Sequence, residues 1–245
     1  MQYVAIIPAR YASSRFPGKP LAPICGKPMI QWVYEHTSKA EGLSAVYVAT
    51  DDERIFNAVA SFGGRAMMTS DRHACGTDRL AECAEKLGLS DDDIVVNVQG
   101  DEPLIKAEMI SDLICAFNDG DVYMATLKKL IAGRQEAENP NVVKVVSDRD
   151  GNALYFSRSM IPFPRGGSFP RVYRHIGMYA YRNWFLQKIT RLEKTQYEEI
   201  ELLEQLRVLE HGFKIRCMET LYQTIGVDVP EDIRLVESEL QKSGA

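Results

Sequence analysis

Short apolar runs alternate with helix-like segments through the first 120 residues, and this alternation most constrains the fold. The runs are continuously apolar, which is typical of strands buried on both faces. Such strands, separated by helices, predict an α/β fold with a mostly parallel sheet covered by helices. The predicted strands are residues 3–8, 45–50, 65–68 and 93–98, and the predicted helices are residues 29–40, 53–62, 78–87 and 107–117.

The pattern changes after residue 120, where strand-like segments dominate. Pro230 is placed to open a last helix, as a proline in the first helical turn. Since no linker or repeat divides the chain, we predict one domain, residues 1–245, with a β-rich excursion in its second half. The strands predicted there are residues 122–127, 142–147, 153–156, 172–181 and 213–218, and the other helices are residues 184–192 and 198–210.

Composition narrows the classes of function. The chain is 45% hydrophobic and 26% charged, with a net charge of -5. An acidic protein is a poor non-specific binder of nucleic acid, so a local group of cations is expected to bind a small anion. Five cysteines without a C-x-x-C pair favour reduced thiols and a cytoplasmic location. We expect neither a signal peptide nor a membrane span, because no basic segment precedes the first strand and no run approaches ~20 apolar residues.

The segment IIPARYASSRFPGKPL, residues 6–21, places Arg10, Arg15 and Lys19 where the first strand stops. It matches neither the P-loop nor the dinucleotide-binding fingerprint. Guanidinium groups, an ammonium group and loop N–H groups are nevertheless what a polyphosphate needs. The alternative is an ordinary solvated basic loop.

Two other segments carry carboxylates that could bind a metal ion. VNVQGDEP, residues 96–103, delivers Asp101 and Glu102 at the end of a strand, and GVDVPEDI, residues 226–233, carries Asp228. Carboxylate oxygens suit Mg²⁺, and Asp101 and Asp228 together could form its site. The alternatives are a polar turn in the first segment and a helix start at Asp228 or Asp232 in the second.

A fourth segment, HACGTDRL, residues 73–80, places Gly76 and Thr77 before a helix. The N-terminus of a helix binds anions and polar edges through its exposed N–H groups. Thr77 could equally serve only as a helix cap.

Together, five segments resemble the 3-deoxy-manno-octulosonate (Kdo) cytidylyltransferase family: IPARYASSRFPGKPL, NVQGDEP, ALYFSR, LEQLRVLE and GVDVPED. The resemblance extends from residue 1 to about residue 237. It implies a Rossmann-like nucleotidyltransferase sheet and a Mg²⁺-dependent reaction. In that reaction CMP passes from CTP to the anomeric hydroxyl of Kdo, an acidic keto-sugar, and pyrophosphate is released. The product would serve lipopolysaccharide or capsule synthesis.

The resemblance also implies a division of labour along the chain. Residues 1–120 would bind the nucleotide, residues 121–225 would bind the sugar and form a homodimer, and residues 226–245 would supply a metal ligand and the C-terminal helix. The implied catalytic residues are Arg10, Lys19, Asp101 and Asp228, with Asp101 and Asp228 as the Mg²⁺ ligands. The implied nucleotide-binding residues are Ala9, Arg10, Arg15, Lys19, Gly76, Thr77 and Arg79. The implied sugar-binding residues are Gln99, Arg158, His175, Tyr179, Glu204 and Gln205.

Some of these roles have ordinary alternatives. A histidine such as His175 in an aromatic strand is often structural, and Glu204 on a helix is often only solvated. The family usually has serine where this chain has Cys75, and a thiol is a weaker hydrogen-bond partner than a hydroxyl. Rival functions are transfer to another acid sugar, such as an 8-amino Kdo analogue or a sialic acid, and a nucleotide sensor without catalysis.

Overall fold

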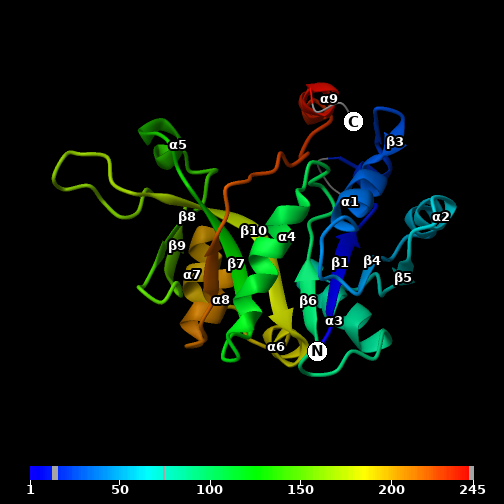
Figure 1. Cartoon of the computed structure of the whole chain (residues 1–245), viewed down its shortest axis with the longest axis horizontal. Helices are drawn as coiled ribbons and strands as arrows, with labels where there is room; N and C mark the ends of the chain where they lie inside the picture. The colour runs from blue at the N-terminus through cyan, green and yellow to red at the C-terminus, as the bar shows by residue number, and fades with distance from the viewer. Residues whose placement is uncertain (13–15, 74, 243–245) are drawn as a thin grey trace.

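A nine-stranded sheet with helices on both faces forms the centre of the molecule (Figure 1). The computed structural model describes residues 1–12, 16–73 and 75–242. Within these ranges the strands are β1 (Tyr3–Ala9), β2 (Pro23–Ile24), β3 (Lys27–Pro28), β4 (Ala45–Thr50), β5 (Ala66–Met68), β6 (Ile94–Asn97), β7 (Met124–Leu130), β8 (Lys144–Ser147), β9 (Ala153–Ser157), β10 (Tyr173–Arg182) and β11 (Arg216–Glu219). The α-helices are α1 (Met29–Thr37), α2 (Glu53–Ser61), α3 (Gly76–Lys86), α4 (Ala107–Ile114), α5 (Arg134–Glu138), α6 (Asn183–Ile189), α7 (Gln196–Glu201), α8 (Gln205–Glu210) and α9 (Asp232–Lys242), with short 3-10 helices at Lys19–Leu21 and Cys115–Asn118.

The main path through the sheet is β11-β7-β10-β6-β1-β4-β5, and β8 and β9 attach beside β10. β1 pairs in parallel with β4 and β6. β5 pairs in parallel with β4, and β11 pairs in parallel with β7. β10 runs antiparallel to both of its neighbours, β6 and β7. The prediction of a mostly parallel sheet is therefore confirmed. The carboxyl ends of β1, β4 and β6 meet at one edge, where sheets of this kind bind ligands.

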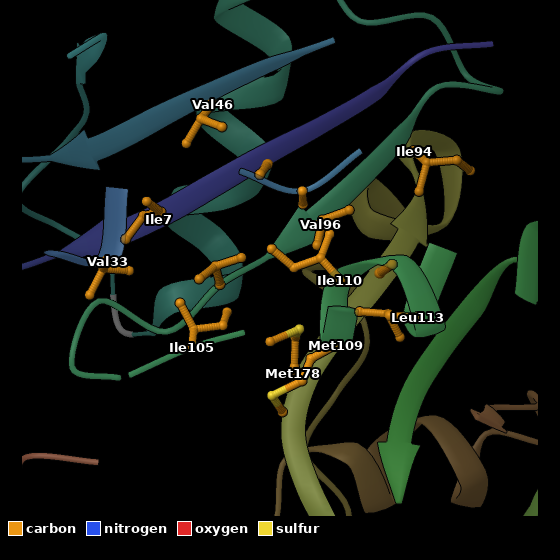
Figure 2. Close-up of a cluster of buried hydrophobic side chains, with 14 of the residues drawn as sticks. Ile7, Val33, Val46, Ile94, Val96, Ile105, Met109, Ile110, Leu113 and Met178 are labelled. Atoms are coloured by element: carbon orange, nitrogen blue, oxygen red, sulfur yellow. The ribbon is translucent and has the colours of Figure 1, made fainter. Parts of the chain in front are cut away.

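Each face of the sheet has its own helices. On one face α1, α2 and α4 cover a hydrophobic cluster that includes Ile7, Val96 and Ile110 (Figure 2). On the other face α3, α6 and α8 cover Val4 and Val95. Because both faces are buried, the strands carry apolar residues on both sides, which explains their continuous apolar runs.

The sequence located most elements but missed one break. The structure divides the helix predicted over residues 198–210 into α7 and α8, and this part of the prediction was wrong. Leu202 adopts a left-handed backbone with φ 53°, which ends α7. The prediction also missed α5 and the β2–β3 pair. No helix in the described ranges is long and apolar enough to cross a membrane.

The C-terminal helix α9 packs beside β2, β3 and α1 (Figure 1). Val236 and Leu240 are buried there against Ile24 and Trp32, and Val227 in the preceding segment is fully buried in the same cluster. Burial of apolar side chains of this size stabilises a docked segment by roughly 1.5–3 kcal/mol each. The C-terminal segment is thereby brought to the edge where β1 and β6 end.

Helix α3 is anchored by Glu82. Its carboxylate accepts hydrogen bonds from Lys86 Nζ at 2.8 Å, from the Ser70 backbone N–H at 2.8 Å, and from His73. Burial alone would raise the pKa of Glu82, but these partners outweigh burial and lower it to about 2. The interaction ties the segment before α3 to the helix that begins at Gly76.

Glu82→Gln is expected to destabilise the fold at pH 7 by about 2 kcal/mol. The folded pKa lies below the ordinary value of 4.5, so the contribution is complete above pH 4.5 and is lost as pH falls toward 2. Urea unfolding at several pH values measures it. Glu85→Gln, an exposed change of equal charge on the same helix, is the control. If the difference in free energy of unfolding between wild type and Glu82→Gln does not decrease below pH 4, this account is contradicted.

Candidate active site

The carboxyl ends of β1 and β6 lie side by side and present their loops at one edge of the sheet. β1 ends at the buried Ala9, and β6 ends at Asn97. Gly100 allows the two loops to approach, because a Cβ at this position would lie only 2.8 Å from the carbonyl oxygen of Pro8. A larger residue would separate the loops. The close approach places the segment QGDE directly beside the end of the first strand.

Lys19 joins three segments that are distant in the sequence. Its ammonium donates to Asp101 Oδ2 at 2.7 Å and to the Val227 carbonyl oxygen at 2.8 Å, and it lies 3.9 Å from Asp228 Oδ1. The Lys19 side chain is 14% exposed, so this ion pair is partly shielded from water. Two carboxylates and a carbonyl oxygen therefore converge on one positive charge. The structure brings together Lys19, Asp101 and Asp228, as the sequence predicted.

Hydrogen bonds hold the segment around Asp228 in place. The Val227 N–H donates to the Asp101 carbonyl oxygen at 2.9 Å. Asp232 Oδ2, at the start of α9, accepts from the N–H groups of Asp228 at 2.8 Å and Val229 at 3.1 Å. Asp232 thus takes the helix-capping role, and the carboxylate of Asp228 is directed to Lys19.

Glu102 has a different environment from its neighbour Asp101. Burial, and then the negative charge of Asp101, raise the pKa of Glu102 to about 7. One carboxyl oxygen, Oε2, is buried with no hydrogen-bond partner in the described part of the chain. A carboxyl group that is half protonated at neutral pH is a weaker cation ligand, so Asp101 is the better candidate in this pair.

A cavity of about 270 Å³ lies next to this edge, between the sheet and the helices α3 and α8. The wall on the α3 side contains Cys75 and the helix start at Gly76 and Thr77. The sheet contributes residues from β6 and β10 and the segments after them, and α8 closes the other side. Of the predicted residues, the cavity wall contains Gly76, Thr77, Gln99, Tyr179, Glu204 and Gln205.

The cavity wall carries more negative than positive charge. Asp78 and Glu204 line it, and its one arginine in the described residues, Arg207, binds both carboxyl oxygens of the nearby Glu198. Burial raises the pKa of Glu204, and the charges of Glu198 and Asp78 add to that rise. Burial likewise raises the pKa of the Cys75 thiol. Cys75 is therefore a neutral wall residue at pH 7.

His175 lies behind the cavity rather than in its wall. Its ring packs against Phe156 at 4.9 Å and Tyr179 at 5.5 Å between centroids, and Nε2 is 2.9 Å from Thr126 Oγ1. Burial lowers the pKa of His175 to about 3, so the ring is neutral at pH 7. His175 is not among the wall residues of this cavity, so its direct contact with a sugar stays a prediction, and here its ring packs against Tyr179.

Arg158 also differs from the prediction. Its Nε donates to the Glu201 carbonyl oxygen at 2.7 Å and its Nη1 to the Pro140 carbonyl oxygen at 3.3 Å. The guanidinium therefore holds the end of α7, whose next residue, Leu202, is in the cavity wall. Arg158 is not in the wall itself, and in this arrangement its cation is used by backbone carbonyl groups.

The prediction for Arg79 was wrong. Its side chain is fully buried and donates to Asp51 at 2.8 Å and to Thr69. These contacts join α3 to the ends of β4 and β5, so Arg79 cannot reach a ligand in the cavity. The sequence could not distinguish this buried ion pair from a nucleotide contact, because Asp51 is distant along the chain.

The remaining cations lie in the loop after β1. Arg10 follows Ala9 directly and is exposed at the same edge as Lys19. Arg15 lies outside the described residues.

The wall residues that the sequence analysis missed include Asp78, Asn97, Tyr181 and Arg207. Asn97 could have been noticed in the sequence, because it is the one amide in the apolar run IVVNV. A polar residue in a strand buried on both faces needs a partner, which is a reason to suspect a site. Asp78 and Arg207 gave no such signal in the sequence, because charged residues on helices are usually solvated.

The family model described as "Cytidylyltransferase" matches residues 4–215. The chain belongs to the cytidylyltransferase family. The match includes both loops at the sheet edge and all of the cavity wall, while Asp228 and α9 lie beyond it. Cytidylyltransferases are nucleotidyltransferases, so this chain is an enzyme of that class.

Individual relatives resemble almost the whole chain. A protein from Syntrophus aciditrophicus named 3-deoxy-manno-octulosonate cytidylyltransferase is 54% identical over 95% of both chains. One from Shewanella sediminis named 8-amino-3,8-dideoxy-manno-octulosonate cytidylyltransferase is 52% identical over 98% of this chain and 99% of its own. A solved structure of CMP:2-keto-3-deoxy-manno-octonic acid synthetase complexed with CTP has a TM-score of 0.94 and 44% identity, over 99% of this chain and 100% of that one. It has the same mixed α/β fold, which confirms the predicted fold class.

Arg79→Met is expected to lower the free energy of unfolding by about 3 kcal/mol, because it leaves Asp51 without its buried partner. The affinity of the folded protein for CTP should stay within threefold. Urea unfolding and isothermal titration with CTP measure the two effects. Arg54→Met, which removes an exposed Arg–Asp pair, is the control and should cost less stability. An Arg79→Met protein of normal stability that no longer binds CTP would restore the original nucleotide-binding role.

Proposed function

We propose that this enzyme transfers CMP from CTP to the anomeric hydroxyl of Kdo in a Mg²⁺-dependent reaction that releases pyrophosphate. The observation that carries the proposal is the convergence on Lys19 of Asp228 and of Asp101, which lies two residues along the chain from the cavity-wall residue Gln99. The relatives named above as acting on Kdo, and the similar structure complexed with CTP, support the choice of substrates.

The donor oxygens fit a divalent ion. Asp101 Oδ2, Asp228 Oδ1 and the Val227 carbonyl oxygen already surround the positive charge of Lys19. Mg²⁺ prefers oxygen ligands and keeps waters and phosphates in its shell, so two protein carboxylates are enough. In the described ranges no group of three or more acidic, histidine or cysteine side chains forms a closed metal cage. When bound, the ion would neutralise phosphate charge and orient the α-phosphate.

The cations after β1 would hold the triphosphate. Lys19 would release its carboxylate partners to bind phosphate oxygens, and Arg10 lies at the same edge for this purpose. The Ala9 backbone and the start of α3 at Gly76 and Thr77 would seat the nucleoside, since the first N–H groups of a helix have no partner within it. Arg15 belongs to the same loop in the sequence and stays a predicted helper.

The cavity would hold the sugar. Gln99, Tyr179, Glu204 and Gln205 supply polar groups that suit a polyhydroxylated ligand. Gln99 Nε2 donates to the Gly177 carbonyl oxygen at 3.2 Å, which fixes its orientation. Because Gln99 is in the wall and Asp101 follows two residues later, a sugar in the cavity would have its reacting hydroxyl near the proposed α-phosphate position.

The protein's contribution to the reaction is placement and charge compensation. The anomeric oxygen attacks the α-phosphorus, and pyrophosphate departs on the opposite side with its charge held by Lys19 and Arg10. Within the described residues no Ser/His/Asp or Cys/His arrangement lines the cavity, and the thiol of Cys75 is neutral. A direct attack by the sugar therefore suits the site better than a covalent enzyme intermediate.

The acidic cavity wall favours a second candidate substrate, the 8-amino analogue named for the Shewanella relative. Asp78 and Glu204 face the cavity, while Arg207 is engaged by Glu198. An ammonium group on the sugar would be attracted by these carboxylates. Pyrophosphate release from CTP with Kdo, the 8-amino analogue and a sialic acid tests both candidates. Binding of CTP without turnover of any of the three sugars would instead favour a nucleotide sensor.

The expected homodimer and cytoplasmic location belong to the same proposal. Several large apolar side chains in residues 121–225 are exposed, among them Phe163 at 83% and Leu154 at 62%, and a second copy could cover them. The five cysteines are all free thiols, which suits a reducing compartment.

Asp101→Asn and Asp228→Asn are each expected to abolish measurable CMP transfer, because an amide is a weaker metal ligand than a carboxylate. The fold should persist, since the amide preserves the shape of the side chain. The pyrophosphate assay at saturating Mg²⁺ measures turnover, and circular dichroism checks folding. Asp121→Asn, an exposed change of equal charge just before β7, is the control. Near-normal rates in either site variant would remove that residue from the metal site.

Lys19→Ala is expected to lower kcat at least ~10²-fold, the effect of losing one preorganised charge-stabilising donor. The same assay measures kcat and the KM for CTP. Lys39→Ala, which removes an exposed lysine after α1, should leave both values unchanged. A loss below threefold in Lys19→Ala would exclude Lys19 from the triphosphate site.

A further inference from the structure

Asn97 is the last residue of β6 and lies in the middle of the sheet. Its neighbour across the antiparallel pair is Tyr179 of β10, so the two side chains point to the same face. That face forms the floor of the cavity, and both residues line it. Asn97 is 5% exposed, so its amide has little access to bulk water.

The amide of Asn97 is only partly satisfied by the protein. The Tyr181 side chain lines the same cavity, yet the Oδ1 of Asn97 is buried with no partner in the described ranges. A buried acceptor without a partner costs about 1–3 kcal/mol. The fold retains this cost at a position where valine or isoleucine, the neighbouring residue types of β6, would fit the strand pattern.

A second unpartnered group lies in the wall opposite. Gln205, at the start of α8, is 7% exposed, and its Nε2 has no partner among the described residues. An acceptor on the sheet and a donor on a helix thus both line the cavity without a protein partner. Groups of this kind are completed when a ligand that carries hydroxyls occupies the space.

The position of Asn97 favours the sugar over the nucleotide. Gly76, at the start of α3, lies over β1, where a Cβ would be 3.5 Å from the Pro8 ring. Asn97 lies between Ile6 of β1 and Tyr179 of β10, and it lines the cavity together with Tyr179, a predicted sugar-binding residue. The nucleoside, seated by Gly76, would occupy the β1 side, and a sugar would occupy the β10 side.

We infer that Asn97 is a specificity-determining residue whose Oδ1 accepts a hydrogen bond from a hydroxyl of the acid sugar, opposite the predicted sugar-binding residue Gln205. This inference rests on the proposed function, since it assumes an acid sugar as the acceptor of CMP. Hydrogen bonds to groups that are otherwise unsatisfied discriminate strongly, because a ligand without the matching hydroxyl leaves them buried and unpaired.

The experiment compares steady-state kinetics of the wild type and Asn97→Ala, with Kdo and CTP varied in turn. The Kdo KM is expected to rise about 5- to 150-fold, the range equivalent to ~1–3 kcal/mol, while the CTP KM stays within twofold. Asn97→Ser keeps a smaller hydrogen-bond acceptor, so its Kdo KM should lie between those of the wild type and Asn97→Ala. It replaces Asn97→Ala in the experiment if that variant does not fold. If Kdo is not turned over by the wild type, the 8-amino analogue replaces it in all arms.

Asn183→Ala is the matched control. Asn183 is also 5% exposed, but its amide is satisfied by the protein: Nδ2 donates to the Leu89 carbonyl oxygen at 2.9 Å, and Oδ1 accepts from Gln187 at 3.3 Å. This variant should lose more thermal stability than Asn97→Ala and leave the Kdo KM unchanged. The reverse pattern would mean that Asn97 is structural and would overturn the inference.

Two further outcomes would overturn it. A Kdo KM within twofold of wild type in both Asn97 variants would mean that Oδ1 contacts no sugar hydroxyl. A rise in the CTP KM equal to the rise in the Kdo KM would place Asn97 in the nucleotide site. A wild type that turns over neither sugar would instead reject the proposed function itself, so the two failures are distinguishable.

Discussion

The candidate site depends on a positive charge held between two carboxylates that are distant from each other in the sequence. Asp101 follows β6, and Asp228 precedes α9. Two carboxylates close together repel each other, and Lys19 offsets this repulsion, because its Nζ lies 2.7 Å from Asp101 Oδ2 and 3.9 Å from Asp228 Oδ1. The apolar contacts of Val227, Val236 and Leu240 supply the force that brings the C-terminal segment there. The protein therefore maintains a cation-binding arrangement with its own ammonium group. On this account Asp101 and Asp228 would hold a divalent ion once Lys19 turned to the phosphates of the nucleotide.

The edge where β1 and β6 end could bind the two proposed substrates, CTP and the acid sugar, at neighbouring positions. β1 and α3 present backbone N–H groups and cations, while β6, β10 and α8 present amides, hydroxyls and carboxylates. Gly100 keeps the two halves in contact, since a side chain there would collide with the Pro8 carbonyl. The break between α7 and α8 at Leu202 serves the same arrangement, because it directs Leu203 and Glu204 into the cavity wall.

Much of this arrangement could be predicted from the sequence. Continuous apolar runs located the parallel strands, and motifs after β1 and β6 located Lys19 and Asp101. Asp228 was assigned through the family resemblance, because its segment alone equally fits a helix start. Arg79 and Arg158 show where such reasoning fails: both occur beside site residues, but their guanidinium groups bind Asp51 and backbone carbonyl groups that only the fold brings near. Asn97 was missed for the opposite reason, since a single amide in an apolar strand becomes meaningful only when its neighbours are known.

The most direct test of the central claim is the position of a divalent ion bound together with CTP. Anomalous diffraction from Mn²⁺, in crystals of this protein grown with CTP, would locate the ion without reference to activity. The account predicts a peak bound by carboxylate oxygens of both Asp101 and Asp228 at about 2.0–2.2 Å, with the Lys19 ammonium moved to the phosphates. A peak that contacts neither carboxylate, with Lys19 still paired to Asp101, would contradict it.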